Sequence, residues 1–501
     1  MSATAAVPEK ELEAATAKTH DGTNAIVTQI IAHSDDADDA LKAFANYDHG
    51  VSIDQETNRK LLRKIDLNIM PLLCIVYMLQ FVDKVSLSYG SVTGLRQDLH
   101  LVGDQYSWLA SIFNFGYLFW EYPTNRLMQH LPLAKYTSFN IIMWGAVLAL
   151  LATTKNFGGA ATLRFFMGVF ESAVTPGFAY FTSQWYTKRE QCARVNYWFA
   201  FAGLSQIFGG VLAWGIAKGI RIHGSEIASW KVIFLTLGLL TAAVGVLFWF
   251  IMPDNQLNAK FLTSEERALA VERIRENNQG IGNRHFKMYQ FKEALTDPMT
   301  WAFCFHSIVA NIGAGGVTNF FSQLIAGFGY TPEQSLLYGS AGGAVEIVAL
   351  VLSGYIGQRT KQRILSSLGG GVAAILGVAL IAGLPLAKKV GRLLGYYLLQ
   401  AGPTPFKTTF GAIYFVGYCI GNIIGPQVFR PKDAPRYQPA VITILVCWTL
   451  SLLDAIFIWW WYRKLNQKKA ELRKAPGYKK VENQEWLDLT DLENPEFTYE
   501  I

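Results

Sequence analysis

Charged side chains are scarce in this sequence. Only 16% of the 501 residues are Asp, Glu, Lys or Arg, whereas soluble globular proteins carry about 25%. The charges crowd into 1–66, 253–297 and 463–501. Between these segments lie apolar runs of about 20 residues, the length of helix that crosses about 30 Å of hydrocarbon. This distribution excludes a soluble protein and predicts an all-α, polytopic membrane protein.

Cysteine pairs and metal-ligand spacings are also missing. The 5 cysteines lie in separate apolar segments without CxxC or Cys/His spacing, so we expect neither a disulfide framework nor a metal site. They are interpreted as buried small apolar residues, and no cofactor is expected. The first 50 residues contain no apolar run of the signal-peptide kind, so no cleavable leader is expected either.

The net charge of +6 does not indicate a nucleic-acid partner. The basic residues flank apolar spans and do not form a stripe with interleaved aromatic residues. Most of them fall on one side of the membrane if both termini are cytoplasmic, as the excess of Lys and Arg in cytoplasmic loops requires. We therefore expect a lipid bilayer around the protein and no nucleic acid. The protein is also expected to be a monomer.

The apolar runs form two sets of six around a charged connector, as in transporters built from two repeats. The expected spans are 69–89, 106–127, 133–153, 160–182, 195–217 and 231–252, then 301–326, 334–357, 364–386, 393–406, 408–429 and 438–462. The expected domains are an N-terminal tail 1–66, a first half 67–252, a connector 253–297, a second half 298–463 and a C-terminal tail 464–501. In the connector, the capping-box pair Thr263 and Glu266 predicts a helix over 263–277.

The tenth run is too short for a crossing. Residues 393–406 form about 21 Å of helix, against about 30 Å of hydrocarbon. The second half is therefore predicted to carry a truncated tenth helix.

Ionisable residues within the spans indicate function, because charge in hydrocarbon is costly. Six are singled out: Asp83, Lys84, Arg164, Glu171, Glu346 and Asp454. Arg164 and Glu171 lie seven residues apart on one helix face. Arg164 can grip a carboxylate with two donors, and Lys84 adds a point charge. Glu346 and Asp454 receive no role.

Glu171 is a candidate proton carrier. Desolvation favours the neutral form of such a carboxyl, whereas a nearby cation favours the charged form. A substrate anion that offsets the cation would therefore bind together with a proton. The alternative is that Asp83–Lys84 and Arg164–Glu171 are satisfied ion pairs that only fix helix packing.

Two further spans carry polar residues with open interpretations. The seventh carries His306 and Asn319 around the glycines of 313–316. These glycines indicate either a broken helix at a substrate site or close helix packing. In the eleventh, Tyr418 and Asn422 share a helix face that either lines a cavity or packs against aromatic rings.

Four segments resemble the anion:cation symporter family of the major facilitator superfamily, and within it the allantoate permease branch known from fungi. They are 80–84, 121–126, 164–177 and 414–427. The resemblance covers about 58–465 and implies a major facilitator fold of two six-helix halves. It also implies proton-coupled uptake of organic anions such as allantoate, ureidosuccinate, nicotinate or pantothenate across the plasma membrane. The family pattern has about twenty more residues in and after the tenth span.

By position, Asp83 and Glu171 match the proton-coupling carboxyls of that family, and Arg164 matches its substrate-gripping arginine. Lys84 stands where related members often have arginine. The expected substrate-binding residues are therefore Lys84, Arg164, His306, Asn319, Tyr418 and Asn422. A transporter is the favoured interpretation, and a nutrient-sensing receptor that binds the anion without transport is the alternative. No catalytic motif of an intramembrane enzyme and no selectivity filter of a channel is found in the spans.

Both termini are predicted to be cytoplasmic, because basic residues cluster at 59–64 before the first span and at 463–474 after the last. A reporter fused after Ile501 should be inaccessible in intact cells and accessible after permeabilisation. Labelling from outside would contradict this orientation.

Overall fold

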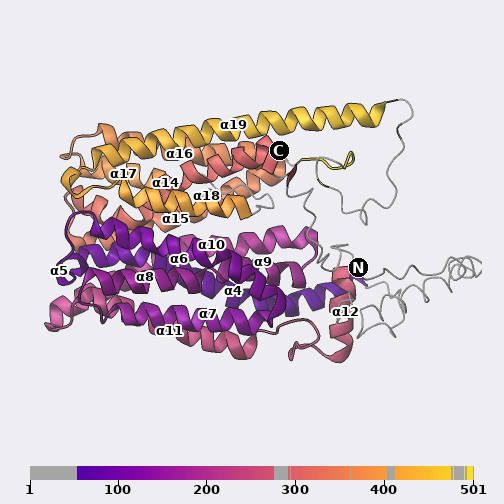
Figure 1. The fold of residues 1–501 in the computed structure, drawn as a ribbon, viewed down its shortest axis with the longest axis horizontal. Coiled ribbons are helices and arrows are strands. Elements are labelled where there is room, and N and C mark those ends of the chain that lie inside the picture. Colours follow the sequence, from indigo (N-terminus) through magenta and orange to yellow (C-terminus); the bar gives the residue numbers. More distant parts are fainter. Residues whose placement is uncertain are drawn as a thin grey trace, which may run out of the picture.

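The protein is a bundle of long helices. The computed structural model describes residues 54–275, 292–293, 295–360, 363–402, 412–475, 478, 490 and 494–499, and these contain no strand. Figure 1 shows two stacked layers of helices, one from each half of the sequence. The short α5 (Leu95–Asp98) marks one end of the bundle and α12 (Ser264–Arg275) marks the other. We call these the α5 end and the α12 end.

The first half contains six spans in seven long helices, because the fourth span is divided. They are α4 (Gln55–Val92), α6 (Gln105–His130), α7 (Leu133–Leu151), α8 (Phe157–Glu171), α9 (Val174–Trp185), α10 (Lys188–His223) and α11 (Ser229–Ile251). Pro176 explains the division between α8 and α9. It has no N–H, and its ring crowds the carbonyl of Ser172, four residues earlier. The division leaves Glu171 as the last residue of α8.

The second half is built from α14 (Pro298–Gly327), α15 (Pro332–Thr360), α16 (Arg363–Gly383), α17 (Lys389–Gln400), α18 (Ala412–Gln427) and α19 (Gln438–Lys474). Both α4 and α19 run well past the expected spans, because apolar patterning marks only the part of a helix in hydrocarbon. Seven of the described helices are long and apolar enough to cross a membrane. Four of the cysteines, Cys74, Cys304, Cys419 and Cys447, are buried and unpaired, as expected.

The truncation of the tenth span is confirmed. Helix α17 has 12 residues, or about 18 Å of helix. It begins at the α5 end and is followed by 403–411, which lie outside the described residues. This helix is shorter than the roughly 30 Å of hydrocarbon that a full crossing spans.

The proposed break in the seventh span is wrong. Helix α14 is continuous across 313–316, and its glycines serve the alternative, close packing. Gly417, Gly421 and Gly425 of α18 face the backbone of α14 at Cys304, Ile308 and Ile312. Side chains at these three positions would collide with carbonyl oxygens, so the ladder brings two backbones into contact.

Helix α12 is tied to the first half. Its capping box is present as predicted, because the Glu266 amide donates to Thr263 Oγ1 at 3.3 Å and the Thr263 amide donates to Glu266 Oε2 at 2.8 Å. Lys64 of α4 donates to Glu266 over 2.6 Å. This contact lowers the pKa of Glu266, so it supports docking at neutral pH and weakens as the pH falls through the pKa of that carboxyl.

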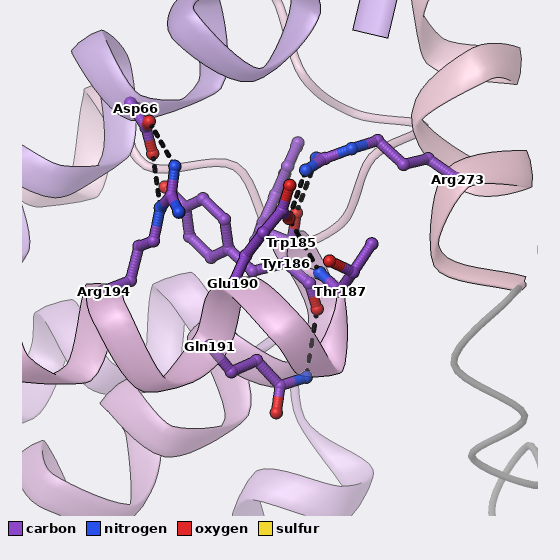
Figure 2. A network of polar contacts seen from close by, with 8 residues as sticks. All are labelled: Asp66, Trp185, Tyr186, Thr187, Glu190, Gln191, Arg194 and Arg273. Atoms are coloured by element: carbon purple, nitrogen blue, oxygen red, sulfur yellow. Dashed lines mark hydrogen bonds and ion pairs between the residues drawn. The ribbon is translucent and has the colours of Figure 1, made fainter. Parts of the chain in front are cut away.

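Beside it, a network of polar contacts joins α4, α10 and α12 (Figure 2). Arg194 grips both carboxylate oxygens of Asp66, at 2.9 and 3.3 Å, and stacks on Tyr186. Arg273 of α12 forms an ion pair with Glu190, whose carboxylate also accepts from the Thr187 amide at 3.1 Å and so caps α10. These contacts hold α12 against the end of the first half.

The hydrogen bonds between the two halves gather toward the α5 end. Tyr106 of α6 donates to the Asn319 carbonyl at 2.7 Å, and the Ser322 amide donates to Ser88 at 3.0 Å. Nearby, Arg221 and Glu333 form an ion pair of 2.9 Å. These contacts therefore hold the two halves together at the α5 end.

Restoring about twenty apolar residues after Phe406 should raise surface expression and uptake together, because a full crossing satisfies every backbone group within the helix. Both would be measured against the native chain in the same cells. Equal uptake at equal expression would show that the short α17 does not limit function.

Candidate functional site

The centre of the site is an ion pair between α4 and α8. Lys84 Nζ lies 3.2 Å from Glu171 Oε1. The Glu171 side chain is fully buried and that of Lys84 is 20% exposed. The Pro176 break fixes where α8 ends, and so places this carboxylate at a helix terminus. The pair neutralises two charges that would each be costly alone in hydrocarbon.

Asp83 points away from its neighbour Lys84. Its Oδ2 accepts a hydrogen bond of 2.8 Å from Trp144 Nε1 of α7, and its Oδ1 accepts one of 3.3 Å from Ser86. Both Asp83 and Trp144 are buried. Asp83 is therefore held by neutral donors in the wall of the first half.

Arg164 is buried with spare donor capacity. Its Nε donates to the Leu109 carbonyl at 3.2 Å, and the guanidinium stacks on Phe113 at 5.2 Å. Its Nη1 is buried without a hydrogen-bond partner in the described chain. The alternative that pairs Arg164 with Glu171 and Asp83 with Lys84 is wrong, because Lys84 takes Glu171 instead.

The second half contributes Tyr418 and Asn422 from α18. Lys84 Nζ lies 3.5 Å from the Tyr418 hydroxyl and 5.9 Å from its ring centroid. Asn422 donates to Asn311 of α14 at 3.4 Å, and its carbonyl accepts from Asn114 of α6 at 3.5 Å. Both candidates thus lie where α18 meets the first half, and Tyr418 contacts the ion pair.

One tyrosine lies close to charged groups from both halves. Tyr77 of α4 interacts electrostatically with Lys84, Glu171, Tyr418 and Glu346. We call these five residues the central cluster. The central cluster includes Glu346, an acid to which sequence analysis gave no role.

His306 and Asn319 lie outside the central cluster. His306 Nδ1 lies 3.5 Å from Asp454 Oδ2 and 3.4 Å from Ser451 Oγ, so it faces α19. The Asn319 side chain donates to the Gly315 carbonyl of its own helix at 2.8 Å. The packing gives neither residue a contact with Lys84, and their role in binding stays a prediction.

Sequence reasoning missed Glu121, Tyr77 and Trp144. Glu121 is an acid inside the expected span 106–127, so the criterion used for the other six would have found it. Its Oε2 is buried without a hydrogen-bond partner in the described chain. No pattern in the sequence marks Tyr77 or Trp144 among the many aromatic residues.

The model of the Major Facilitator Superfamily matches residues 73–445, which is most of the chain. The chain belongs to the major facilitator superfamily. It is therefore a multi-pass membrane transporter, and the fold predicted from sequence is confirmed.

Named relatives cover almost the whole of this transporter. An uncharacterized transporter of Schizosaccharomyces pombe is 39% identical over 89% of this chain and 90% of its own length. The allantoate permease of Saccharomyces cerevisiae is 35% identical over 94% and 91%. The thiamine pathway transporter of the same yeast is 33% identical over 89% and 87%. The resemblance to the allantoate permease branch is thus confirmed.

Solved structures support the same fold. The xylose transporter from E. coli, in a partially occluded inward open conformation, superposes with a TM-score of 0.60 at 12% identity, covering 78% of this chain and 98% of that one. This likeness concerns the fold alone.

The ion pair gives a test of stability. Lys84→Met leaves Glu171 buried and unpaired, and should lower the free energy of unfolding by about 2–3 kcal/mol, less than for a fully buried pair because Lys84 is partly exposed. Lys84→Met with Glu171→Gln should recover most of the loss, since no charge is then left alone.

Denaturant unfolding in detergent micelles would measure both changes. Lys60→Met is the control, because Lys60 pairs with Glu56 on an exposed surface and its loss should be within about 0.5 kcal/mol. Equal destabilisation by the single and double variants would show that the pair does not act as a unit.

Proposed function

We propose that the protein carries a small organic anion into the cell together with a proton, by alternating access. The observation that carries this proposal is the Lys84–Glu171 ion pair, in contact with Tyr418 of the other half. Charge that lies where two moving halves meet is suited to a carried ion.

The anion is proposed to bind at Lys84 and Arg164. Lys84 is the accessible cation of the pair, and the unused Nη1 of Arg164 offers a further charged donor. Tyr418 and Asn422 would complete the site from α18. The relatives support a carboxylate as substrate, since the allantoate permease is named for one.

Proton coupling would follow from competition for Lys84. An anion that takes Lys84 must displace Glu171, and a buried carboxylate without its cation favours the neutral, protonated form. Anion and proton then bind together, and the cell's proton gradient would drive accumulation. Asp83, held by Trp144 and Ser86, would support this charge balance from the wall of the site.

The proposed location is the plasma membrane, with the α12 end in the cytoplasm. The halves are latched at the α5 end, which would then face outward, so this conformation would release substrate inward. We also propose that the protein acts as a monomer.

The short α17 favours a second candidate, a receptor that binds the anion without carrying it. Its 12 residues leave a crossing incomplete, which would disturb movement more than binding. Purified protein that binds anions, in cells that show no uptake of labelled anion, would identify the receptor.

Coupling is tested by Glu171→Gln, which keeps size and polarity but cannot release a proton. In proteoliposomes this variant should still exchange anion by counterflow, while accumulation driven by a pH gradient disappears. Arg164→Ala should reduce both, about tenfold or more, because a charged donor to the anion is lost.

Glu56→Gln, at an exposed position on α4, is the matched control and should leave both activities unchanged. Accumulation driven by pH that persists in Glu171→Gln would remove this carboxyl from the coupling step.

A further inference from the structure

Glu346 lies on the face of α15 that meets the first half. One turn earlier, Gly343 packs against the backbone of Gly203 on α10, and Ile347 packs there as well. Glu346 also interacts electrostatically with Tyr77 of the central cluster and with Tyr396 of α17. The Glu346 carboxyl therefore lies at the interface between the two halves.

Three other acids of this region have a partner close by. Glu171 pairs with Lys84, Asp83 accepts from Trp144, and Asp454 lies beside His306. For Glu346, which is partly exposed, no ion pair is formed within the described chain, and desolvation is the main influence on its carboxyl. A carboxyl held in a membrane without a donor is costly, so a donor that arrives with a ligand would offset that cost.

The chemistry of this donor follows from the charges around it. Lys84 and Arg164 in the first half suit a carboxylate, while Glu346 in the second half would repel another one. A carboxylate oxygen accepts hydrogen bonds and donates none. The part of the substrate near Glu346 should therefore present hydrogen-bond donors, and an amide or ureide supplies N–H donors without adding a second negative charge.

We propose that Glu346 is a specificity-determining residue, which accepts hydrogen bonds from an amide or ureide N–H at the end of the substrate remote from its carboxylate. This inference rests on the proposed function and adds a second anchor to the same site. The substrate would bridge the halves, with its carboxylate on the first half and its nitrogen groups on the second.

The test compares two carboxylates of equal size. In 3-ureidopropanoate the far end is a ureide, and in 5-methylhexanoate it is a branched hydrocarbon with the same number of heavy atoms. Binding of each to the purified full chain in nanodiscs should favour the ureide. Glu346→Ala should reduce that preference about tenfold to a hundredfold, the usual effect of losing a hydrogen bond to a charged group.

Two variants guard against a general loss of structure. Glu346→Asp keeps the carboxylate and should retain part of the preference. Glu226→Gln removes a carboxyl from an exposed loop and should leave the preference unchanged. Binding of 5-methylhexanoate to Glu346→Ala should stay near that of the unmodified protein, because its hydrocarbon end makes no use of the carboxylate.

Three outcomes would overturn the inference. The first is equal binding of both probes by the unmodified protein, and the second is an undiminished preference for the ureide in Glu346→Ala. The third is a Glu346 variant that keeps the preference but loses accumulation driven by a pH gradient, which would make Glu346 a proton carrier. If neither probe binds the unmodified protein, the proposed function itself fails, and the inference falls with it.

Discussion

The interaction on which the site depends is the ion pair of Lys84 and Glu171, formed where water is scarce. Neither group could stay charged alone at that depth without a large cost. Each therefore holds the other in place, and their long side chains link α4 to α8. The surrounding contacts serve this pair: Trp144 draws Asp83 away from Lys84, and Tyr418 covers the ammonium group from the opposite half.

Fold and site differ in how far sequence could predict them. Long apolar runs and the grouping of charge at the segment ends were enough for two sets of helices and a short tenth one. The partner of Lys84 was not predictable, because it depends on how α4 and α8 are each oriented within the bundle. Adjacent residues such as Asp83 and Lys84 point to different neighbours, and spacing along one helix says nothing of which neighbour is nearer.

Glycine shows the same limit in another way. The run at 313–316 was equally compatible with a break and with close packing, since glycine both weakens a helix and narrows it. Helix α18 distinguishes the two interpretations, because its glycines recur every four residues and face α14, as close packing requires. Information from two distant segments was needed to interpret either one.

The carboxylate of Glu190 serves two structures at once. It caps the first turn of α10 through Thr187, and it neutralises Arg273 of α12. Exchanging the two charges, with arginine at 190 and glutamate at 273, would rebuild the ion pair but would place a cation at a helix N-terminus that needs an acceptor. The ion pair alone could therefore be formed with either arrangement of the two charges, whereas the cap of α10 requires the carboxylate at position 190.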